Sequence, residues 1–291
     1  MKADGRLPSF VVAGTQKAAT TWLYECLKEH PQVHVPEIKE LHFFCDPRDC
    51  GKSRRERGED WYRAQFAAPP GCLEAGELSI DYMYYRQIPE QLAAMNPDLK
   101  VLFILRDPVE RAYSAYWMSR RNHVDYPPFN AFVRSDSEFV SRGLYWRQIE
   151  RYRRCFPAEQ IKVMIYEAIP EDPGAFLAEV FAFLGVDPAV RPPSMHQRIA
   201  ATRAMNPAAS SVYYGAASRV LRLPPVLWGW RRFKRLSGLR QARPRGVGAT
   251  RPAPRYAPMC PEERQLLKGL YREETERLFD MLGRRVEQWD T

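Results

Sequence analysis

The sequence predicts an α/β fold in which a central parallel sheet is flanked by helices. Three short apolar runs, Pro8–Gly14, Leu99–Leu105 and Gln160–Tyr166, are typical of strands that are buried on both faces. Segments with helical spacing of apolar residues alternate with these runs. Strands that alternate with helices indicate a parallel sheet covered on both sides, with ligands at the carboxyl ends of the strands.

The elements follow in order along the chain. Pro8–Gly14 ends at a glycine, and Thr20–Glu29 then places its apolar residues on one side of a helix. After the second strand, Pro108 begins a helix at a position where proline is tolerated. Gly174–Leu184 predicts an apolar helix, and Glu262–Leu282 a long last helix.

Composition predicts one globular domain over residues 1–291. Hydrophobic residues make up 45% and charged residues 27% of the 291, which excludes a disordered chain. No apolar run approaches the roughly 20 residues of a membrane-spanning helix, and the N-terminus lacks the pattern of a signal peptide. We therefore expect a soluble, cytoplasmic protein. The cysteines and histidines show neither disulfide-framework nor metal-ligand spacing, so we expect free thiols and no metal site.

The positive charge is concentrated near the C-terminus. Net charge is +9, yet the stretch Pro188–Pro261 carries fourteen lysines and arginines and no acidic residue. This predicts an anionic partner and a basic helical or loop insertion over residues 188–255. Its aromatic part, Val212–Leu236, leaves three interpretations open. The segment is a lid over a ligand pocket, a peripheral contact with the inner face of an anionic membrane, or a helical insertion packed on the core.

The first motif is Gly14–Thr21 (GTQKAATT), between a predicted strand and a predicted helix. Backbone N–H groups at a helix start, a lysine and two hydroxyls make a cradle for an anion. The motif is not a Walker A loop, because Lys17 does not directly precede the hydroxyl residue. The plainer alternative is an ordinary strand–helix turn with Thr20 as the N-cap.

Two further motifs carry charged side chains. In Lys39–Phe44 (KELHFF) the carboxylate of Glu40 is a candidate general base, although a solvated glutamate would give the same pattern. In Leu105–Ser114 (LRDPVERAYS) a predicted strand ends in Arg106, whose guanidinium can bind a phosphate through two hydrogen bonds. Ser114 can add a hydroxyl donor to the same phosphate. The alternative for the second motif is a surface pair of Arg106 with Asp107, with Ser114 packed inside the helix.

Together the three motifs resemble the PAPS-dependent sulfotransferases, where PAPS is 3'-phosphoadenosine 5'-phosphosulfate. The resemblance is greatest to the branch with the heparan-type glycan sulfotransferases and their bacterial cytoplasmic relatives. It covers about Pro8–Leu184 and Tyr256–Trp289, with smaller matches at Glu77–Tyr82 and Gly143–Tyr145. It implies the sulfotransferase fold, with its P-loop-like strand–loop–helix, and PAPS as the sulfuryl donor.

The resemblance also assigns site residues. The 5'-phosphosulfate would be held by Thr15, Gln16, Lys17, Ala18, Ala19, Thr20 and Thr21. Arg106 and Ser114 would hold the 3'-phosphate, and Arg251 and Arg255 are the nearest substitutes for a basic C-terminal loop. Lys17 would stabilise the leaving phosphate and Glu40 would be the general base. His42 is either a second candidate base or a packing residue. Ser79 and Tyr145 would lie near the acceptor; the alternatives are a strand-end serine without a ligand for Ser79 and a core residue for Tyr145.

The implied reaction is in-line transfer of a sulfuryl group to a hydroxyl or amine of a glycan, glycolipid or small molecule. The product is adenosine 3',5'-bisphosphate (PAP), and no metal is required. Leu78 replaces a lysine that touches the acceptor in heparan-type members, which argues against a polyanionic glycan. The alternatives are a P-loop nucleotide kinase using ATP–Mg²⁺, which the missing GK[ST] disfavours, and a nucleic-acid-binding protein. The latter leaves Lys17 and Glu40 without a role, so we expect no nucleic-acid partner.

Overall fold

The computed structural model describes residues 7–48, 50–120, 128–135, 137–197 and 258–290. Within them lies a five-stranded sheet in the order β2-β3-β1-β4-β5, and each neighbouring pair is parallel. The strands are β1 Phe10–Gly14, β2 Val33–His34, β3 Glu74–Leu78, β4 Lys100–Leu105 and β5 Ile161–Ile165. The predicted α/β class with a parallel sheet is confirmed.

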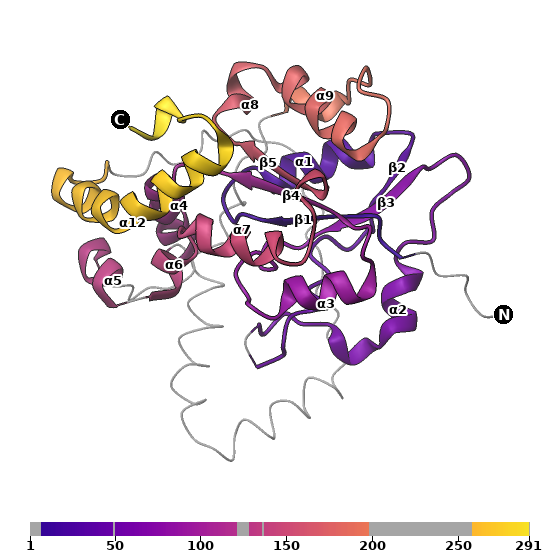
Figure 1. Ribbon diagram of the computed structural model, residues 1–291, viewed down its shortest axis with the longest axis horizontal. Coiled ribbons are helices and arrows are strands. Elements are labelled where there is room, and N and C mark those ends of the chain that lie inside the picture. The colour runs from indigo at the N-terminus through magenta and orange to yellow at the C-terminus, as the bar shows by residue number, and fades with distance from the viewer. Residues whose placement is uncertain (1–6, 49, 121–127, 136, 198–257, 291) are drawn as a thin grey trace, which may run out of the picture. The chain divides into compact units, whose positions relative to one another are not determined.

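Helices connect and cover the strands (Figure 1). The α-helices are α1 Thr20–Lys28, α2 Glu59–Ala64, α3 Ile88–Met95, α4 Pro108–Arg120, α5 Phe129–Ser135, α6 Ser137–Ser141, α7 Tyr145–Arg153, α8 Ala168–Glu171, α9 Pro173–Leu184 and α12 Pro261–Leu282. Short 3₁₀ turns are η1 Arg55–Arg57, η2 Ala158–Gln160, η3 Pro193–His196 and η4 Glu287–Trp289. The bounds of the helices predicted from apolar spacing agree with these to within one residue.

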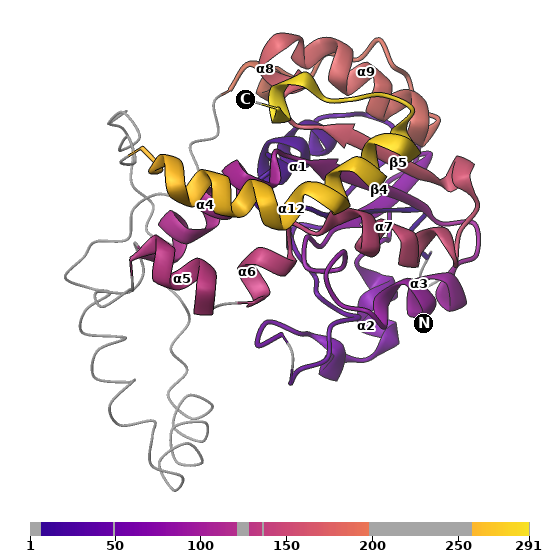
Figure 2. The same cartoon turned by 60° about the vertical axis from the view of Figure 1, so that its left-hand side comes forward.

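Side chains alternate across the sheet, as a strand's twofold period requires. Phe10 and Val12 of β1 pack on the face covered by α1 and α9. Val11 and Ala13 pack on the opposite face, where α2, α3, α7 and α12 contribute buried residues. Figures 1 and 2 show these two groups of helices on either side of the strands. β1, and β4 from Val101 onward, are therefore buried on both faces, which is why they are continuously apolar in sequence.

Local signals explain where α9 begins and ends. Asp172 is its N-cap and accepts a hydrogen bond from the backbone N–H of Ala175 at 2.9 Å. Pro173 occupies the first turn, where its missing N–H costs nothing. Gly185 ends the helix at φ 83°, a left-handed conformation that favours glycine. The buried apolar side of α9 then packs on β1 and β4.

The carboxyl ends of β1, β3 and β4 lie at one edge of the sheet, because the strands are parallel. The loop after β1 meets the loop after β3 closely: the N–H of Met83 donates to the carbonyl of Ala13 at 2.9 Å. A β-carbon on Gly14 would lie 2.8 Å from Cβ of Met83. Glycine is required at the end of β1 for this approach.

The chain divides into two compact units. The first comprises Met1–Ala115, Phe129–Ile199 and Met259–Thr291, and it holds the five strands. The second comprises Tyr116–Pro128 and Ala200–Pro258. Most of the second unit lies outside the described residues, so the single domain over 1–291 and the insertion over 188–255 stay predictions. Among the helices that are described, none combines the length and apolar character needed to cross a bilayer.

Candidate active site

The loop Thr15–Ala19 connects β1 to α1 and forms the predicted anion cradle. Lys17 and Ala19 adopt left-handed backbone conformations, with φ of 75° and 57°. Ala19 is the N-cap of α1, and within the described structure this end has no side-chain cap and no acidic residue in the first turn. A helix start leaves its first N–H groups for other acceptors and carries partial positive charge. The alternative in which Thr20 caps the helix is wrong, because Thr20 is the first residue of the helix.

Arg106 joins the end of β4 to this cradle. Its Nη1 donates to the backbone oxygen of Lys17 at 3.3 Å, and its guanidinium lies 4.9 Å from the ring centre of Tyr166. Its own backbone oxygen accepts from the hydroxyl of Tyr145 at 2.8 Å. Arg106 also lines a cavity of about 520 Å³, shared with Glu110 and Arg264. The two cations predicted from separate motifs therefore converge on one loop.

Ser114 is not joined to Arg106 by a hydrogen bond in the described part of the chain. It lies within α4 and is mostly buried. The start of α4 is held by Asp107, whose Oδ1 accepts from the N–H of Val109 at 2.7 Å. Burial raises the pKa of Asp107 to about 6 although this bond favours the charged form. Asp107 makes no ion pair with Arg106 among the described residues, so the surface pair is wrong, whereas Ser114 packed inside the helix, the other part of that alternative, agrees with the structure.

Glu40 lies at the carboxyl end of β3, where its N–H donates to the carbonyl of Leu78 at 3.1 Å. One carboxylate oxygen is 2.6 Å from Nζ of Lys39, and the other is 3.4 Å from Nε2 of His42. Burial alone would raise the pKa of Glu40, but His42 and Lys39 outweigh it and lower the pKa to about 2. Glu40 is therefore ionised at neutral pH and can accept a proton, but a carboxylate with so low a pKa is a weak base.

Buried polar groups anchor the loop that carries Glu40 and His42. The N–H of His42 donates to Oγ of Ser79 at 3.2 Å, and Ser79 in turn donates to the carboxylate of Glu77. The hydroxyls of Tyr62 and Tyr82 also donate to Glu77, at 2.6 and 3.1 Å. Burial raises the pKa of Glu77, and these three hydroxyls oppose that rise. Glu77 thus anchors Ser79, and Ser79 anchors the backbone next to Glu40.

The structure places two predicted acceptor residues inside the protein. Ser79 is 0% and Tyr145 2% exposed, and the hydroxyl of each is engaged with protein atoms. In this structure they hold the backbone of His42 and of Arg106, and contact with an acceptor stays a prediction. Arg251 and Arg255 lie outside the described residues.

Other residues of the site had no clear signal in the sequence. Nη1 of Arg54 donates to the backbone oxygen of Glu40 at 2.6 Å. Arg142 pairs with Oδ1 of Asp81 at 2.8 Å, and Oδ2 of Asp81 is 3.6 Å from Nδ1 of His42. Asp81 stood within a matched segment, but nothing marked the two arginines.

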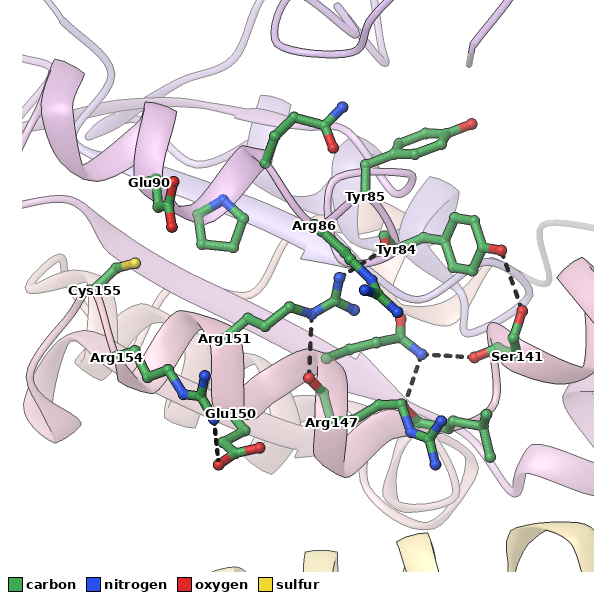
Figure 3. A pocket seen from close by; sticks show the side chains of 14 residues that line it. Tyr84, Tyr85, Arg86, Glu90, Ser141, Arg147, Glu150, Arg151, Arg154 and Cys155 are labelled. Atoms are coloured by element: carbon green, nitrogen blue, oxygen red, sulfur yellow. Dashed lines mark hydrogen bonds and ion pairs between the residues drawn. The ribbon is translucent and has the colours of Figure 1, made fainter.

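A groove of about 760 Å³ lies between α3 and α7 (Figure 3). Two tyrosines and four arginines are among its lining residues: Tyr84, Tyr85, Arg86, Arg147, Arg151 and Arg154. The ring of Tyr84 lies 4.4 Å from the guanidinium of Arg142, the residue that pairs with Asp81. Contacts therefore connect the groove through Asp81 to His42 and Glu40.

The chain is also similar to known proteins. A family model described as "Sulfotransferase domain" matches residues 7–209. The chain belongs to the sulfotransferase family. Human bifunctional heparan sulfate N-deacetylase/N-sulfotransferase 3 is 33% identical over 209 residues, which cover 64% of this chain and 23% of that protein. Human heparan sulfate glucosamine 3-O-sulfotransferase 5 is 29% identical over 197 residues, covering 64% of this chain and 55% of that protein.

This sulfotransferase-family chain thus spans about a quarter and about half of the lengths of these two relatives. Among solved structures, a sulfotransferase from Alicyclobacillus acidocaldarius superposes with a TM-score of 0.70 at 23% identity. The superposition covers 98% of this chain and 100% of that one, and it shows the shared fold. The family match confirms the resemblance seen in the motifs and does not favour a nucleotide kinase.

Proposed function

We propose that this chain is an enzyme that transfers a sulfuryl group from PAPS to a hydroxyl or amine of an acceptor. The observation that carries the proposal is the 3.3 Å contact between Arg106 and the backbone of Lys17, which brings two motif cations to one loop. The uncapped start of α1 adds N–H groups there. A donor with phosphates at both its 3' and 5' positions matches this arrangement.

Glu40 and Lys17 would have separate roles in an in-line displacement. When bound, PAPS supplies the sulfuryl group and a phosphate leaving group. As the acceptor atom bonds to sulfur, the bond from sulfur to the phosphate oxygen breaks, and PAP is released. Glu40 takes the acceptor's proton, and Lys17 stabilises the negative charge on the leaving phosphate. None of these roles calls for a metal ion.

Binding of PAP is the first test. At 100 times its Kd, a ligand of the native state adds about 2.7 kcal/mol of stability. We expect PAP to raise the melting temperature clearly, with a smaller shift from 5'-AMP at equal concentration. A shift with ATP–Mg²⁺ and none with PAP would refute the proposed donor.

For the acceptor, we propose an anionic glycan that binds in the groove between α3 and α7. Arg86 and Arg151 have no acidic partner in the described structure, whereas Arg147 and Arg154 pair with Glu274 and Glu150. Arg151 donates to the backbone oxygens of Tyr84 and Arg147, and its charge has no acidic partner among the described residues. Guanidinium groups without an acidic partner, in a groove that two tyrosines also line, suit sulfate and carboxylate groups on a sugar chain. The two relatives are named for heparan sulfate, which supports the same class. The proposal departs from the expectation drawn from Leu78, which is buried and cannot contact an anionic acceptor; the groove arginines would make that contact instead.

The Arg151→Ala variant tests the groove. Loss of one charged contact corresponds to about 1.5 kcal/mol, so we expect about a tenfold rise in KM for a sulfated oligosaccharide. The value of kcat should change little, because the contact is present in both ground and transition states. Arg153→Ala is the control, since Arg153 is exposed on α7 outside the groove lining. Equal KM values for the two variants would place the acceptor elsewhere.

Location and association rest on the sequence alone. We propose a cytoplasmic location, with the basic segment making a peripheral contact with anionic membrane at the inner face. Val212–Leu236 lies outside the described residues, and sedimentation with anionic vesicles at low salt is the measurement that tests the contact.

A further inference from the structure

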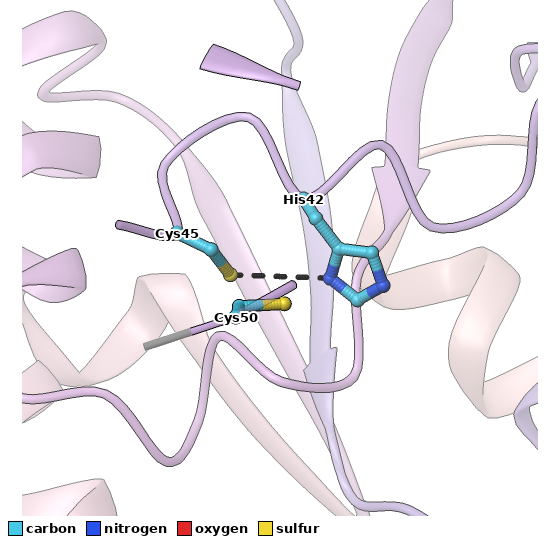
Figure 4. Close-up of side chains that lie close together, drawn as sticks. All are labelled: His42, Cys45 and Cys50. Atoms are coloured by element: carbon cyan, nitrogen blue, oxygen red, sulfur yellow. Dashed lines mark hydrogen bonds between the residues drawn. The ribbon is translucent and has the colours of Figure 1, made fainter. Parts of the chain in front are cut away.

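A histidine and two cysteines lie close together next to Glu40, the candidate general base. His42, Cys45 and Cys50 come from the loop between β2 and η1, and their ligand atoms all lie within 4.8 Å of one another. The three residues are buried, with exposed fractions of 1%, 0% and 6%. Figure 4 shows both sulfur atoms on the Nδ1 side of the imidazole ring. Their spacing of three and five residues fits no familiar ligand motif, so the sequence did not reveal the group.

The separations suit a tetrahedral ion of borderline softness. Zinc binds thiolate sulfur at about 2.3 Å and imidazole nitrogen at about 2.0–2.1 Å, which puts ligands roughly 3.5–3.8 Å apart. The distance from Sγ of Cys45 to Nδ1 of His42 is 3.9 Å. Small side-chain rotations would bring the three atoms onto one ion. Imidazole with two thiolates also selects zinc over magnesium or calcium, which prefer oxygen.

We propose that His42, Cys45 and Cys50 bind one structural Zn²⁺ ion, with Asp81 as the fourth ligand. Oδ2 of Asp81 lies 3.6 Å from Nδ1 of His42, while its Oδ1 is held by Arg142 at 2.8 Å. The carboxylate is thus fixed with one oxygen toward the imidazole. Binding releases one proton from each thiol, and the zinc comes from the medium. No redox change is involved.

Zinc bound at this site would fix which ring nitrogen of His42 faces Glu40 with a proton. The consequence for Glu40 rests on the proposed function. With Nδ1 bound to zinc, the ring must carry its proton on Nε2. That nitrogen is buried, makes no hydrogen bond within the described residues, and lies 3.4 Å from Oε2 of Glu40. His42 would then donate toward Glu40 and orient it. It would be a positioning residue and not a second base.

Metal content is the direct test, and it does not depend on PAPS or on activity. We expect about one zinc per chain in protein purified without chelators, measured by mass spectrometry of the metal. The Cys50→Ser variant should lose it, because removal of a direct thiolate ligand lowers zinc affinity by more than the roughly 10–100-fold that loss of an outer-shell partner costs. Cys72→Ser is the matched control, because Cys72 lies outside the cluster, and it should keep the zinc.

Melting temperature gives a second readout in the same samples. A strong chelator should lower the melting temperature of the wild type and of Cys72→Ser, and added Zn²⁺ should restore it, whereas Mg²⁺ should not. Cobalt bound to the wild type should show a thiolate charge-transfer band, which keeps the test valid if Cys50→Ser folds poorly. Wild-type protein that binds neither zinc nor cobalt, whether its thiols are free or Cys45 and Cys50 form a disulfide, would overturn the proposal.

Discussion

Replacing Glu40 by glutamine is expected to lower kcat by about 10²–10⁴-fold, the usual contribution of a general base. Glutamine has nearly the same shape as glutamate, but it cannot accept the acceptor's proton. The side chain is 23% exposed, and Lys39 and His42 lower its pKa to about 2, so its charge stabilises the folded state and the variant should also melt at a lower temperature. The value of kcat is therefore compared at a temperature where both proteins are folded. The affinity for PAP should stay close to that of the wild type, because the donor loop belongs to β1 and α1.

Glu37→Gln is the matched control for this experiment. Glu37 is also a carboxylate paired with a lysine, Lys28, but its side chain is 86% exposed. We expect its kcat to equal that of the wild type. Steady-state kinetics and PAP titration should be run on both variants. A kcat for Glu40→Gln within a few fold of the wild type would show that the proton leaves by another route.

The sheet and its main helices could be predicted because their signals are local. Val101–Leu105 of β4 is continuously apolar because both faces are covered, and that can be read from a single segment. β2, by contrast, has only two residues, Val33 and His34, and pairs with β3 through contacts that no local pattern specifies. The same is true of α2, whose buried Tyr62 is recognised only by its long-range bond to Glu77.

The site could be predicted in part for a similar reason. Parallel strands end at one edge, so Lys17 after β1 and Arg106 after β4 were expected to be near each other, and they are joined. Burial was harder to foresee. Ser79 and Tyr145 were placed near the acceptor by the family resemblance, but packing turns both inward, as the alternative of a core Tyr145 had it. The link from Asp81 to Arg142 spans 61 positions and depends on where α6 and α7 pack, which the sequence alone does not specify.

Replacing Arg106 by alanine is expected to weaken PAP binding by about 10–100-fold. Hydrogen bonds to charged groups contribute about 1.5–3 kcal/mol each, and Arg106 is assigned to the 3'-phosphate. The variant also loses the 3.3 Å bond to the backbone of Lys17. An ordinary hydrogen bond contributes about 1 kcal/mol, so this indirect effect on the 5'-phosphate loop should be about fivefold. Titration with PAP and 5'-AMP separates the two contributions.

The comparison of the two ligands decides what Arg106 binds. If it contacts the 3'-phosphate, PAP should lose much more affinity than 5'-AMP, which lacks that group. Equal losses would mean that Arg106 acts only through the loop that holds the 5'-phosphate. Arg277→Ala supplies the control for removal of a positive charge, because Arg277 is exposed on α12 and paired with Glu273 at 2.7 Å. Since long-range effects of surface charge are screened by salt, this variant should bind both ligands as the wild type does.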